Sequence, residues 1–269
     1  MSALPSTGKA ARPPAFPTNW LTRLLWVALA LYTIYATSIM GVTWERFLRG
    51  LDAGAVFIGR MFPPNMAADK LDLIKDGMIE SIQIAVLATF FGVLLSIPLG
   101  FAAARNLSPG WLSWTARASI AVFRSFHPVI VSILFVKAVG FGALAGVLAL
   151  IISSMGFVAK LFAEVVEEMN PKQVEAVRAT GASFMNVLVM AVAPQVMARF
   201  VGLTVYQFDS NLRNSTMVGI VGGGGIGAPL FTAYQRFDYD VVAAILIAII
   251  AVVFAAEVVS TRIQKIFGE

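Results

Sequence analysis

The fold of this chain depends on one polar stretch, Asn170-Pro171-Lys-Gln173-Val-Glu175-Ala176-Val-Arg178-Ala-Thr-Gly181, which is followed thirteen residues later by Pro194. Asn suits the N-cap of a helix, Pro suits its first position, and Gln173 at N3 can complete a capping box. Gly181 is placed to end that helix in a left-handed conformation. Residues 182–193 can form a second helix leading to Pro194, which opens the next span. The stretch therefore predicts a helix–turn–helix elbow attached directly to a membrane helix, so that a push on the elbow can tilt that helix.

The composition is that of an integral membrane protein. Of 269 residues, 58% are hydrophobic and 13% are charged, whereas soluble domains are about 45–50% apolar and about 25% charged. The chain has no Cys and a single His, His127, so we expect no disulfide framework and no thiolate or multi-histidine metal site. The net charge of +5 reflects basic residues flanking membrane spans, and nucleic acid is not an expected partner.

Hydrophobic runs close to the ~20 residues that a hydrocarbon core requires predict an all-α polytopic membrane protein with about six transmembrane helices. The predicted spans are Leu24–Val42, Met78–Ala104, Trp114–Val136, Ala143–Phe162, Pro194–Leu212 and Val241–Ser260. Lys and Arg are somewhat more frequent on the side that holds both termini and the elbow. By the positive-inside rule, the N-terminus, the C-terminus and the elbow are expected in the cytoplasm.

Three regions follow from these spans. Residues 1–23 are rich in proline and have little apolar surface to bury, which predicts a disordered cytoplasmic tail. Residues 24–76 contain the first transmembrane helix and an outer-side linker; the linker favours a surface helix followed by a turn at Pro63-Pro64. Residues 77–269 form the main transmembrane domain, with the elbow in a cytoplasmic loop at 163–193.

The elbow resembles the EAA motif of bacterial ABC importer permeases. In that motif Glu-Ala-Ala, three residues, Gly, nine residues and Ile-x-Leu-Pro form the coupling helices, and Glu175, Ala176, Gly181 and Pro194 fall at this spacing. The resemblance implies that Glu175 and its helix, which also carries Arg178, dock in a groove of a separate ATPase.

The chain departs from the motif at three positions: Val177 stands for the second alanine, and Ala191 and Ala193 stand for Ile and Leu. Further stretches resemble the phosphonate-transporter branch of these permeases. They are Arg124-Ser-Phe-His127-Pro128, Val139-Gly-Phe-Gly142, Gly146-Val-Leu-Ala-Leu150, Gly156-x-x-x-Lys160-Leu-Phe-x-Glu164 and Asn211-Leu-Arg213-Asn-Ser215-Thr216-x-x-Gly219-x-x-Gly222-Gly-Gly-Gly225-Ile-Gly227. Together they extend the resemblance over about residues 78–262.

The resemblance implies a type I ABC importer permease fold and a transport function without chemistry of its own. The chain is expected to be the transmembrane permease subunit of an ATP-driven importer for phosphonate or a related small phosphorus oxyanion, namely phosphite, hypophosphite or phosphate. Its implied partners are a second copy of itself, two ABC ATPase subunits that use ATP and Mg²⁺, a periplasmic or lipid-anchored substrate-binding protein, and membrane lipid. It would bind no cofactor itself, and its implied location is the bacterial inner membrane.

The glycine cluster has two open interpretations. Gly222, Gly223, Gly224, Gly225 and Gly227 match the letters of a dinucleotide-binding fingerprint, but the soluble strand–turn–helix unit and the acidic residue that it needs are missing, and no P-loop Gly-Lys-Ser/Thr follows. One interpretation is irregular backbone that lines a translocation path or gate, where free N–H groups can bind an anion. The other is close packing of helices by small residues.

Arg124 and His127 lie within the predicted third span. Intramembrane ionisable residues usually face the interior of a helix bundle and mark function. For Arg124, an anion path and a structural role both remain open, with the structural role favoured. His127 is predicted to be a hydrogen-bonded interior residue and not a proton relay.

Arg213 is the stronger candidate for contact with a substrate anion. It falls at the end of the predicted fifth span, beside Asn211, Ser215 and Thr216 and just before the glycine cluster. A guanidinium matches phosphoryl oxygens in bidentate geometry. A substrate in transit must nevertheless be held weakly, because tight binding would block its exit.

Two alternative functions are a secondary transporter or channel for a small anion, and an intramembrane enzyme. A secondary carrier usually shows inverted repeats and acidic coupling residues within spans; the chain has no convincing repeat, and we expect no Asp or Glu deep in a span. An enzyme needs clustered catalytic side chains, and no catalytic residue is expected here. The charged residues Lys160, Glu164, Glu167 and Glu168 are predicted to be a solvated cytoplasmic helix end with a Lys160–Glu164 pair.

Overall fold

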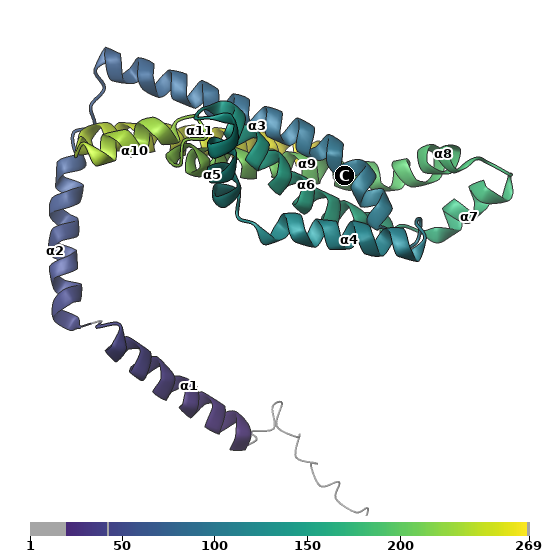
Figure 1. Ribbon diagram of the computed structural model, residues 1–269, viewed down its shortest axis with the longest axis horizontal. Helices are drawn as coiled ribbons and strands as arrows, with labels where there is room; N and C mark the ends of the chain where they lie inside the picture. Colours follow the sequence, from purple (N-terminus) through teal and green to yellow (C-terminus); the bar gives the residue numbers. More distant parts are fainter. Residues whose placement is uncertain (1–19, 42, 268–269) are drawn as a thin grey trace, which may run out of the picture. The chain divides into compact units, whose positions relative to one another are not determined.

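The computed structural model describes residues 20–41 and 43–267, and every regular element within them is helical. Most of the predicted tail at 1–23 therefore lies outside the described residues, as do Val42 at the end of the first predicted span and residues 268–269. The chain divides into two units, of which the first ends at Gly59 and the second begins at Arg60 (Figure 1).

The first unit holds α1 (Trp20–Ile39) and most of α2 (Trp44–Met61). α1 has the length and hydropathy of a membrane span. The charged residues of α2 gather on one face of the helix, where Glu45 and Arg49 form an ion pair at 3.1 Å. The helix predicted in the linker is thus confirmed, and an irregular stretch through Pro63-Pro64 follows it.

The second unit begins its membrane helices with α3 (Ala68–Ala103). At 1.5 Å per residue its 36 residues reach about 54 Å, well beyond a hydrocarbon core of about 30 Å. The predicted start at Met78 is therefore ten residues late. Hydropathy marks only the apolar part of a helix, and the first turns of α3, with Asp69 and Lys70, are polar.

The third predicted span is wrong as one straight helix, because α4 (Gly110–Ser125) and α5 (Pro128–Val139) meet at a bend of 85°. Pro128 has no N–H with which to continue the hydrogen-bond ladder of α4, and it disfavours helical backbone at His127, whose ψ is 138°. The His127 ring instead accepts the Val129 N–H at 3.3 Å and starts the new helix.

The remaining helices build the elbow and the rest of the bundle. They are α6 (Ala143–Glu167), α7 (Pro171–Ala179), α8 (Phe184–Val187), the π-helical turn η1 (Leu188–Val192), α9 (Ala193–Ile220), α10 (Gly227–Gln235) and α11 (Tyr239–Phe267). One helix runs from Phe184 through η1 to Ile220, so the fifth predicted span, at 194–212, is too short at both ends.

The centre of the second unit is the long contact of α3 with α6, and both helices also contact α9 (Figure 1). Small residues permit this approach. A Cβ atom added at Gly92 would lie 2.5 Å from the Ser154 Cβ, and one added at Gly100 would lie 2.6 Å from the Phe162 Cδ1. α3 and α6 therefore pack nearly backbone to backbone at these two points.

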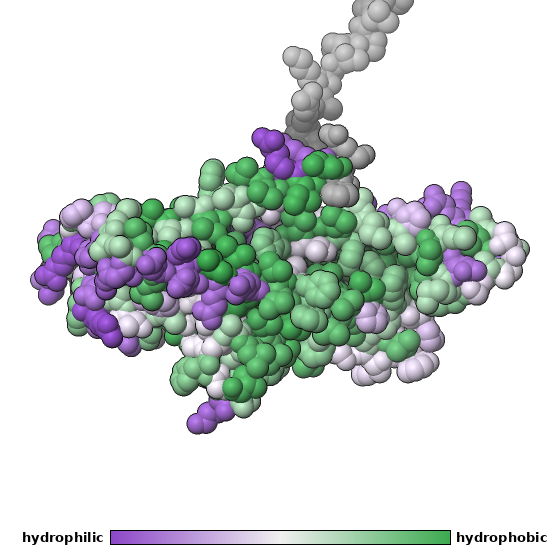
Figure 2. All heavy atoms as spheres, turned by 90° about the horizontal axis from the view of Figure 1, so that it is seen from above, coloured by the Kyte–Doolittle hydropathy of each residue, from purple (hydrophilic) through white to green (hydrophobic). Residues whose placement is uncertain are grey.

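Five described helices are long and apolar enough to cross a membrane, or six if the bent pair α4 and α5 counts as one span. The predicted all-α fold with about six spans is confirmed. Figure 2 shows hydrophobic side chains over the middle of the second unit and hydrophilic ones gathered at the end where α3 begins. The elbow, formed by α7 and α8, lies at the opposite end of α3 (Figure 1).

Candidate functional site

The first turn and the last turn of α7 form as the sequence predicts. The Asn170 side chain accepts the Lys172 N–H at 3.0 Å, and Gly181 follows the helix with φ +77°. The predicted capping box does not form with Gln173. The Asn170 N–H instead donates to the Gln195 Oε1 of α9 at 3.0 Å, so a neighbouring helix satisfies it and thereby holds the start of the elbow.

The elbow has an exposed face and a buried face. Glu175, Ala176 and Arg178 are exposed, whereas Val174 and Val187 are 5% and 1% exposed. The buried side chains pack with the ends of α3, α6 and α9 in one cluster, which comprises Ala104, Phe162, Val166, Val174, Val187, Ala191, Val192 and Val196. The motif residues are thus presented outward from a platform that belongs to the membrane bundle.

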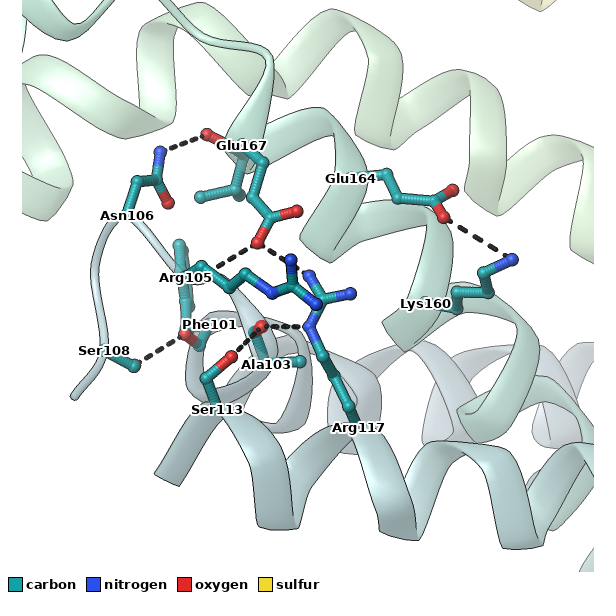
Figure 3. Close-up of polar contacts among 11 residues, drawn as sticks. Phe101, Ala103, Arg105, Asn106, Ser108, Ser113, Arg117, Lys160, Glu164 and Glu167 are labelled. Carbon is teal, nitrogen blue, oxygen red and sulfur yellow. Dashed lines mark hydrogen bonds and ion pairs between the residues drawn. The ribbon is translucent and has the colours of Figure 1, made fainter. Parts of the chain in front are cut away.

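Glu167, at the end of α6, joins three elements beside the elbow (Figure 3). Its Oε1 accepts the Arg105 N–H and the Arg117 Nη2, each at 2.6 Å. The Ala103 carbonyl, which ends α3, accepts the Arg117 Nε at 3.0 Å and the Ser113 hydroxyl at 2.8 Å. The prediction of a freely solvated helix end is wrong for Glu167, whose side chain is 28% exposed, because its partners lie far away in sequence.

A second set of contacts holds the residues on either side of the elbow: the end of α6 to α9, and α9 to the π-helical turn before it. Glu168 pairs with Arg199 at 2.6 Å, and the Gln195 Nε2 donates to the Ala191 carbonyl at 2.7 Å. The Glu168–Arg199 pair is more than 60% exposed on both side chains and contributes little by itself. Because of these contacts and the buried cluster, a displacement of the elbow should also move the first turns of α9.

The second helix of the elbow is more irregular than predicted. α8 is a single turn, and η1 follows it because Pro194 cannot donate a backbone hydrogen bond to the preceding turn. The Ala193 N–H donates to the Leu188 carbonyl, five residues back. Pro194 therefore lies within a continuous helix and widens one of its turns, and it does not open the span.

A buried polar network links α3, α6 and α9. The Asn211 Nδ2 donates to the Thr89 and Ser154 hydroxyls, each at 2.9 Å, and the Asn211 Oδ1 accepts the Gln207 Nε2 at 3.0 Å. Asn211 is 0% exposed, so within this chain it lies between helices. The sequence carried a signal for Gln207, since two amides four residues apart share one helix face, but nothing in it identified Thr89 and Ser154.

Arg213 lies well inside α9 and not at its end. Its Nη1 pairs with the Asp209 Oδ2 at 2.5 Å, and the side chains of Arg213 and Asp209 are 45% and 11% exposed. The expectation that no acid lies deep in a span is wrong for Asp209, which the short predicted span had placed near a helix end. Its Oδ1 is buried without a hydrogen-bond partner among the described residues.

The glycine cluster forms a tightly packed turn between α9 and α10. Gly222, Gly224 and Gly225 have φ of +95°, +79° and +75°, which L side chains disfavour. A Cβ added at Gly224 would lie 2.6 Å from the Ala143 N, and one at Gly225 would lie 2.5 Å from the Ser81 Oγ. This geometry supports the close-packing interpretation of the cluster.

The other residues in and beside the turn are also closely packed. An added Cβ at Gly223 would contact Val218, and one at Gly227 would contact the carbonyl of Thr216, which is partly buried. Ser215 is fully buried and donates to the Leu212 carbonyl at 2.7 Å. The path or gate role of these residues stays a prediction.

Arg124 and His127 lie at the break between α4 and α5. Both are exposed in this chain, so His127 is not the predicted interior residue; it is the N-cap of α5. Because the proline bend ends α4 there, Arg124 falls in a last helical turn and not in the middle of a span.

The spans and their packing define a multi-pass helical membrane protein. Within that class the chain belongs to the family of binding-protein-dependent transport system inner membrane components, which its residues 96–269 match. It is therefore an inner-membrane component of a transport system, and its task is transport and not catalysis.

Two relatives extend this comparison. The chain is 36% identical to the phosphite transport system permease protein PtxC of Stutzerimonas stutzeri, over 99% of this chain and 98% of that protein. It is 46% identical to the phosphate-import permease protein PhnE of Mycolicibacterium smegmatis over 77% of this chain, and it spans 39% of the length of that protein.

Solved structures show the same fold. A chain from inward-facing structures of the MetNI methionine ABC transporter matches 75% of this chain and 99% of its own length, with a TM-score of 0.67 and 22% identity. A chain of a bacterial ABC transporter involved in alginate import matches 91% of this chain and 99% of its own length, with a TM-score of 0.55 and 15% identity. The predicted type I ABC importer permease fold is confirmed.

Proposed function

We propose that this chain forms the membrane pathway of an ATP-driven importer for phosphonate or a related small phosphorus oxyanion (phosphite, hypophosphite or phosphate). The similarity to a phosphite permease over nearly the full length of both chains supports this cargo class. The similarity to a phosphate-import permease supports it independently. The proposed coupling of transport to ATP rests on one observation: the elbow exposes its Glu175 face and is anchored to three membrane helices.

The elbow is the proposed docking surface for an ATPase, on the cytoplasmic side together with both termini. Glu175, Ala176 and Arg178 would contact the ATPase, while Gly181 supplies the turn and Pro194 the widened helical turn behind it. ATP and Mg²⁺ binding would bring two ATPase subunits together, draw two elbows toward each other and open the path to a substrate-binding protein. Two copies of this chain are the proposed pore, since a path on a symmetry axis needs matching halves.

Arg213 is the proposed contact for the oxyanion in the path. Its guanidinium is half exposed and already holds one carboxylate oxygen of Asp209, so a passing oxyanion would exchange with a protein anion. Such an exchange keeps binding weak, as transit requires. Asn211 and Ser215 are buried and would support the path helix from its inner side. Thr216 and the glycine turn would line the next part of the path. Arg124 and His127, which lie at the α4–α5 bend, are proposed to line the path or its gate.

Uptake into proteoliposomes tests the proposed cargo. Vesicles that contain this chain with its partner ATPase, supplied with its binding protein, are expected to accumulate phosphite or an alkylphosphonate only when ATP is present. Sulfate at the same concentration is the control anion. Accumulation without ATP, or equal accumulation of sulfate, would contradict the proposal.

Arg213→Ala is expected to lower substrate-stimulated uptake about tenfold or more, because one charge-assisted contact to a phosphoryl group is lost. Basal ATPase activity should change less than twofold. The matched control is Arg262→Ala, which removes an exposed arginine from the end of α11. Parallel loss of uptake and basal ATPase activity in Arg213→Ala would indicate a folding defect and remove the support for a path role.

A further inference from the structure

A small basic pocket lies between α4 and α6, at the elbow end of the bundle. Its volume is about 150 Å³, and its walls carry Arg117 and Arg124 from α4 and Lys160 from α6. Ala103, at the end of α3, and Ala163 form part of its apolar lining. Three cations thus converge on a space that is large enough for one small anion.

Helical spacing brings these cations together. Arg117 and Arg124 are seven residues apart on α4 and share one face, as do Lys160, Glu164 and Glu167 on α6. Gly156 lets the end of α4 approach α6 closely: a Cβ added there would lie 2.9 Å from the Phe123 Cβ and 3.1 Å from the Arg124 Cγ. The aliphatic stem of Arg124 is therefore held against α6 one turn before Lys160.

The charges of the pocket are only partly balanced, and two of its cations, Arg117 and Lys160, have acidic partners (Figure 3). Arg117 is bound to Glu167 at 2.6 Å, while Lys160 lies 3.5 Å from Glu164, with both of those side chains more than 40% exposed. Arg124 forms no ion pair within residues 20–41 and 43–267. One positive charge remains after both acids are counted, and it favours an anion in the pocket.

The pocket lies beside residues typical of a membrane–water boundary. Trp111 and Trp114, in the first turns of α4, are 70% and 73% exposed, and Trp is enriched where bilayer meets water. Arg117 is one turn further along the same helix. Basic pockets between transmembrane helices on the cytoplasmic side bind anionic lipid head groups.

We propose that this pocket binds a phosphate-type oxyanion, supplied either by an anionic phospholipid head group or by free phosphate. Arg124 and Lys160 supply the donors, and Arg117 forms the back of the site while it remains bound to Glu167. The site is distinct from Arg213 on α9 and does not depend on which cargo the transporter carries.

Two binding measurements on the full-length chain, purified in maltoside detergent and freed of lipid, test the site. Native mass spectrometry counts bound phosphatidylglycerol against phosphatidylcholine with the same acyl chains, and equilibrium dialysis measures bound radiolabelled inorganic phosphate. Arg124→Gln and Lys160→Gln should each weaken binding about fivefold in whichever arm shows it. Glu164→Gln should strengthen it about fivefold, because Lys160 loses its competing carboxylate.

The controls separate this site from folding and from the transport path. Arg262→Gln should leave binding unchanged in both arms, Arg213→Ala should leave phosphatidylglycerol binding unchanged, and melting temperatures in detergent should match across the variants used. Preferential binding of phosphatidylglycerol that depends on Arg124 identifies the head group as the ligand, and dependence in the phosphate arm identifies the free ion. The proposal is overturned if neither arm responds to Arg124→Gln, Lys160→Gln and Glu164→Gln, if Arg262→Gln has the same effect as Arg124→Gln in either arm, or if Arg213→Ala has the same effect as Arg124→Gln on phosphatidylglycerol binding. These outcomes do not involve uptake, so they are independent of the proposed function.

Discussion

Glu175→Lys is expected to lower ATP-driven uptake about 30-fold or more while the chain still inserts and folds. Glu175 is exposed on α7 and makes no hydrogen bond or ion pair within the described residues, so its replacement removes no internal contact. Truncating or reversing one partner of a charge pair buried at an interface costs several kcal/mol, much of it from the charge that remains unpaired. The loss should therefore appear in the coupling to the ATPase.

Gln173→Lys is the matched control, since it introduces the same side chain two residues away on an exposed position of the same helix. Uptake and substrate-stimulated ATPase activity in proteoliposomes, together with the melting temperature in detergent, measure the effect. Full uptake by Glu175→Lys, or equal losses in both variants, would refute docking through the Glu175 face.

The anchoring of the elbow explains why such a surface change should reach the membrane path. Val174 and Val187 are buried with residues of α3, α6 and α9, and Gln195 of α9 holds the N–H of Asn170. Glu167 fixes the end of α6 to α4 and to Arg105, the second residue after α3. Packed interiors transmit displacement because they have few voids in which to absorb it.

Gly227→Ala is expected to destabilise the chain by about 3 kcal/mol or more, at the upper end of the cost of overpacking. The added Cβ would contact the Thr216 carbonyl oxygen and would lie 2.7 Å from the Ile220 N and 2.8 Å from the Gly219 Cα. These are backbone atoms of α9, so no side-chain rotation can relieve the overlap. The turn would have to separate from α9.

Gly202→Ala is the matched control, because a Cβ at this position of α9 meets nothing within 4 Å. It should leave stability unchanged or raise it by up to about 1 kcal/mol, the helix preference of Ala over Gly. Thermal unfolding in detergent measures both variants. Equal melting temperatures for Gly227→Ala and the unmodified chain would show that the turn is loose, as a mobile gate would be.

Features set by neighbours in sequence were predictable. The Asn170 cap, the first-turn Pro171 and the left-handed Gly181 each depend on contacts within a few residues, and the hydrophobic runs alone predicted most of the spans. The extents of α3 and α9 were not predictable in this way, because their polar ends are stabilised as helix by packing that hydropathy does not register.

The partners of Glu167 and Asn211 were decided by tertiary structure. Arg117 meets Glu167 across 50 residues of sequence, and Asn211 meets Thr89 across 122. Loop closure over such distances leaves no periodic signal in a single sequence, so these residues could be recognised as polar but not assigned their contacts.

The sequence by itself determined a helical membrane bundle with an elbow between two spans, because hydrophobic length, helix caps and a glycine break act locally. Only the tertiary structure decided that the glycine turn is closely packed against other helices, that Asn211 bonds to Thr89 and Ser154 on two other helices, and that Glu167 binds Arg117 on α4. Those outcomes depend on which helices come into contact, and close packing between them fixes where a side chain can fit and which charge it meets.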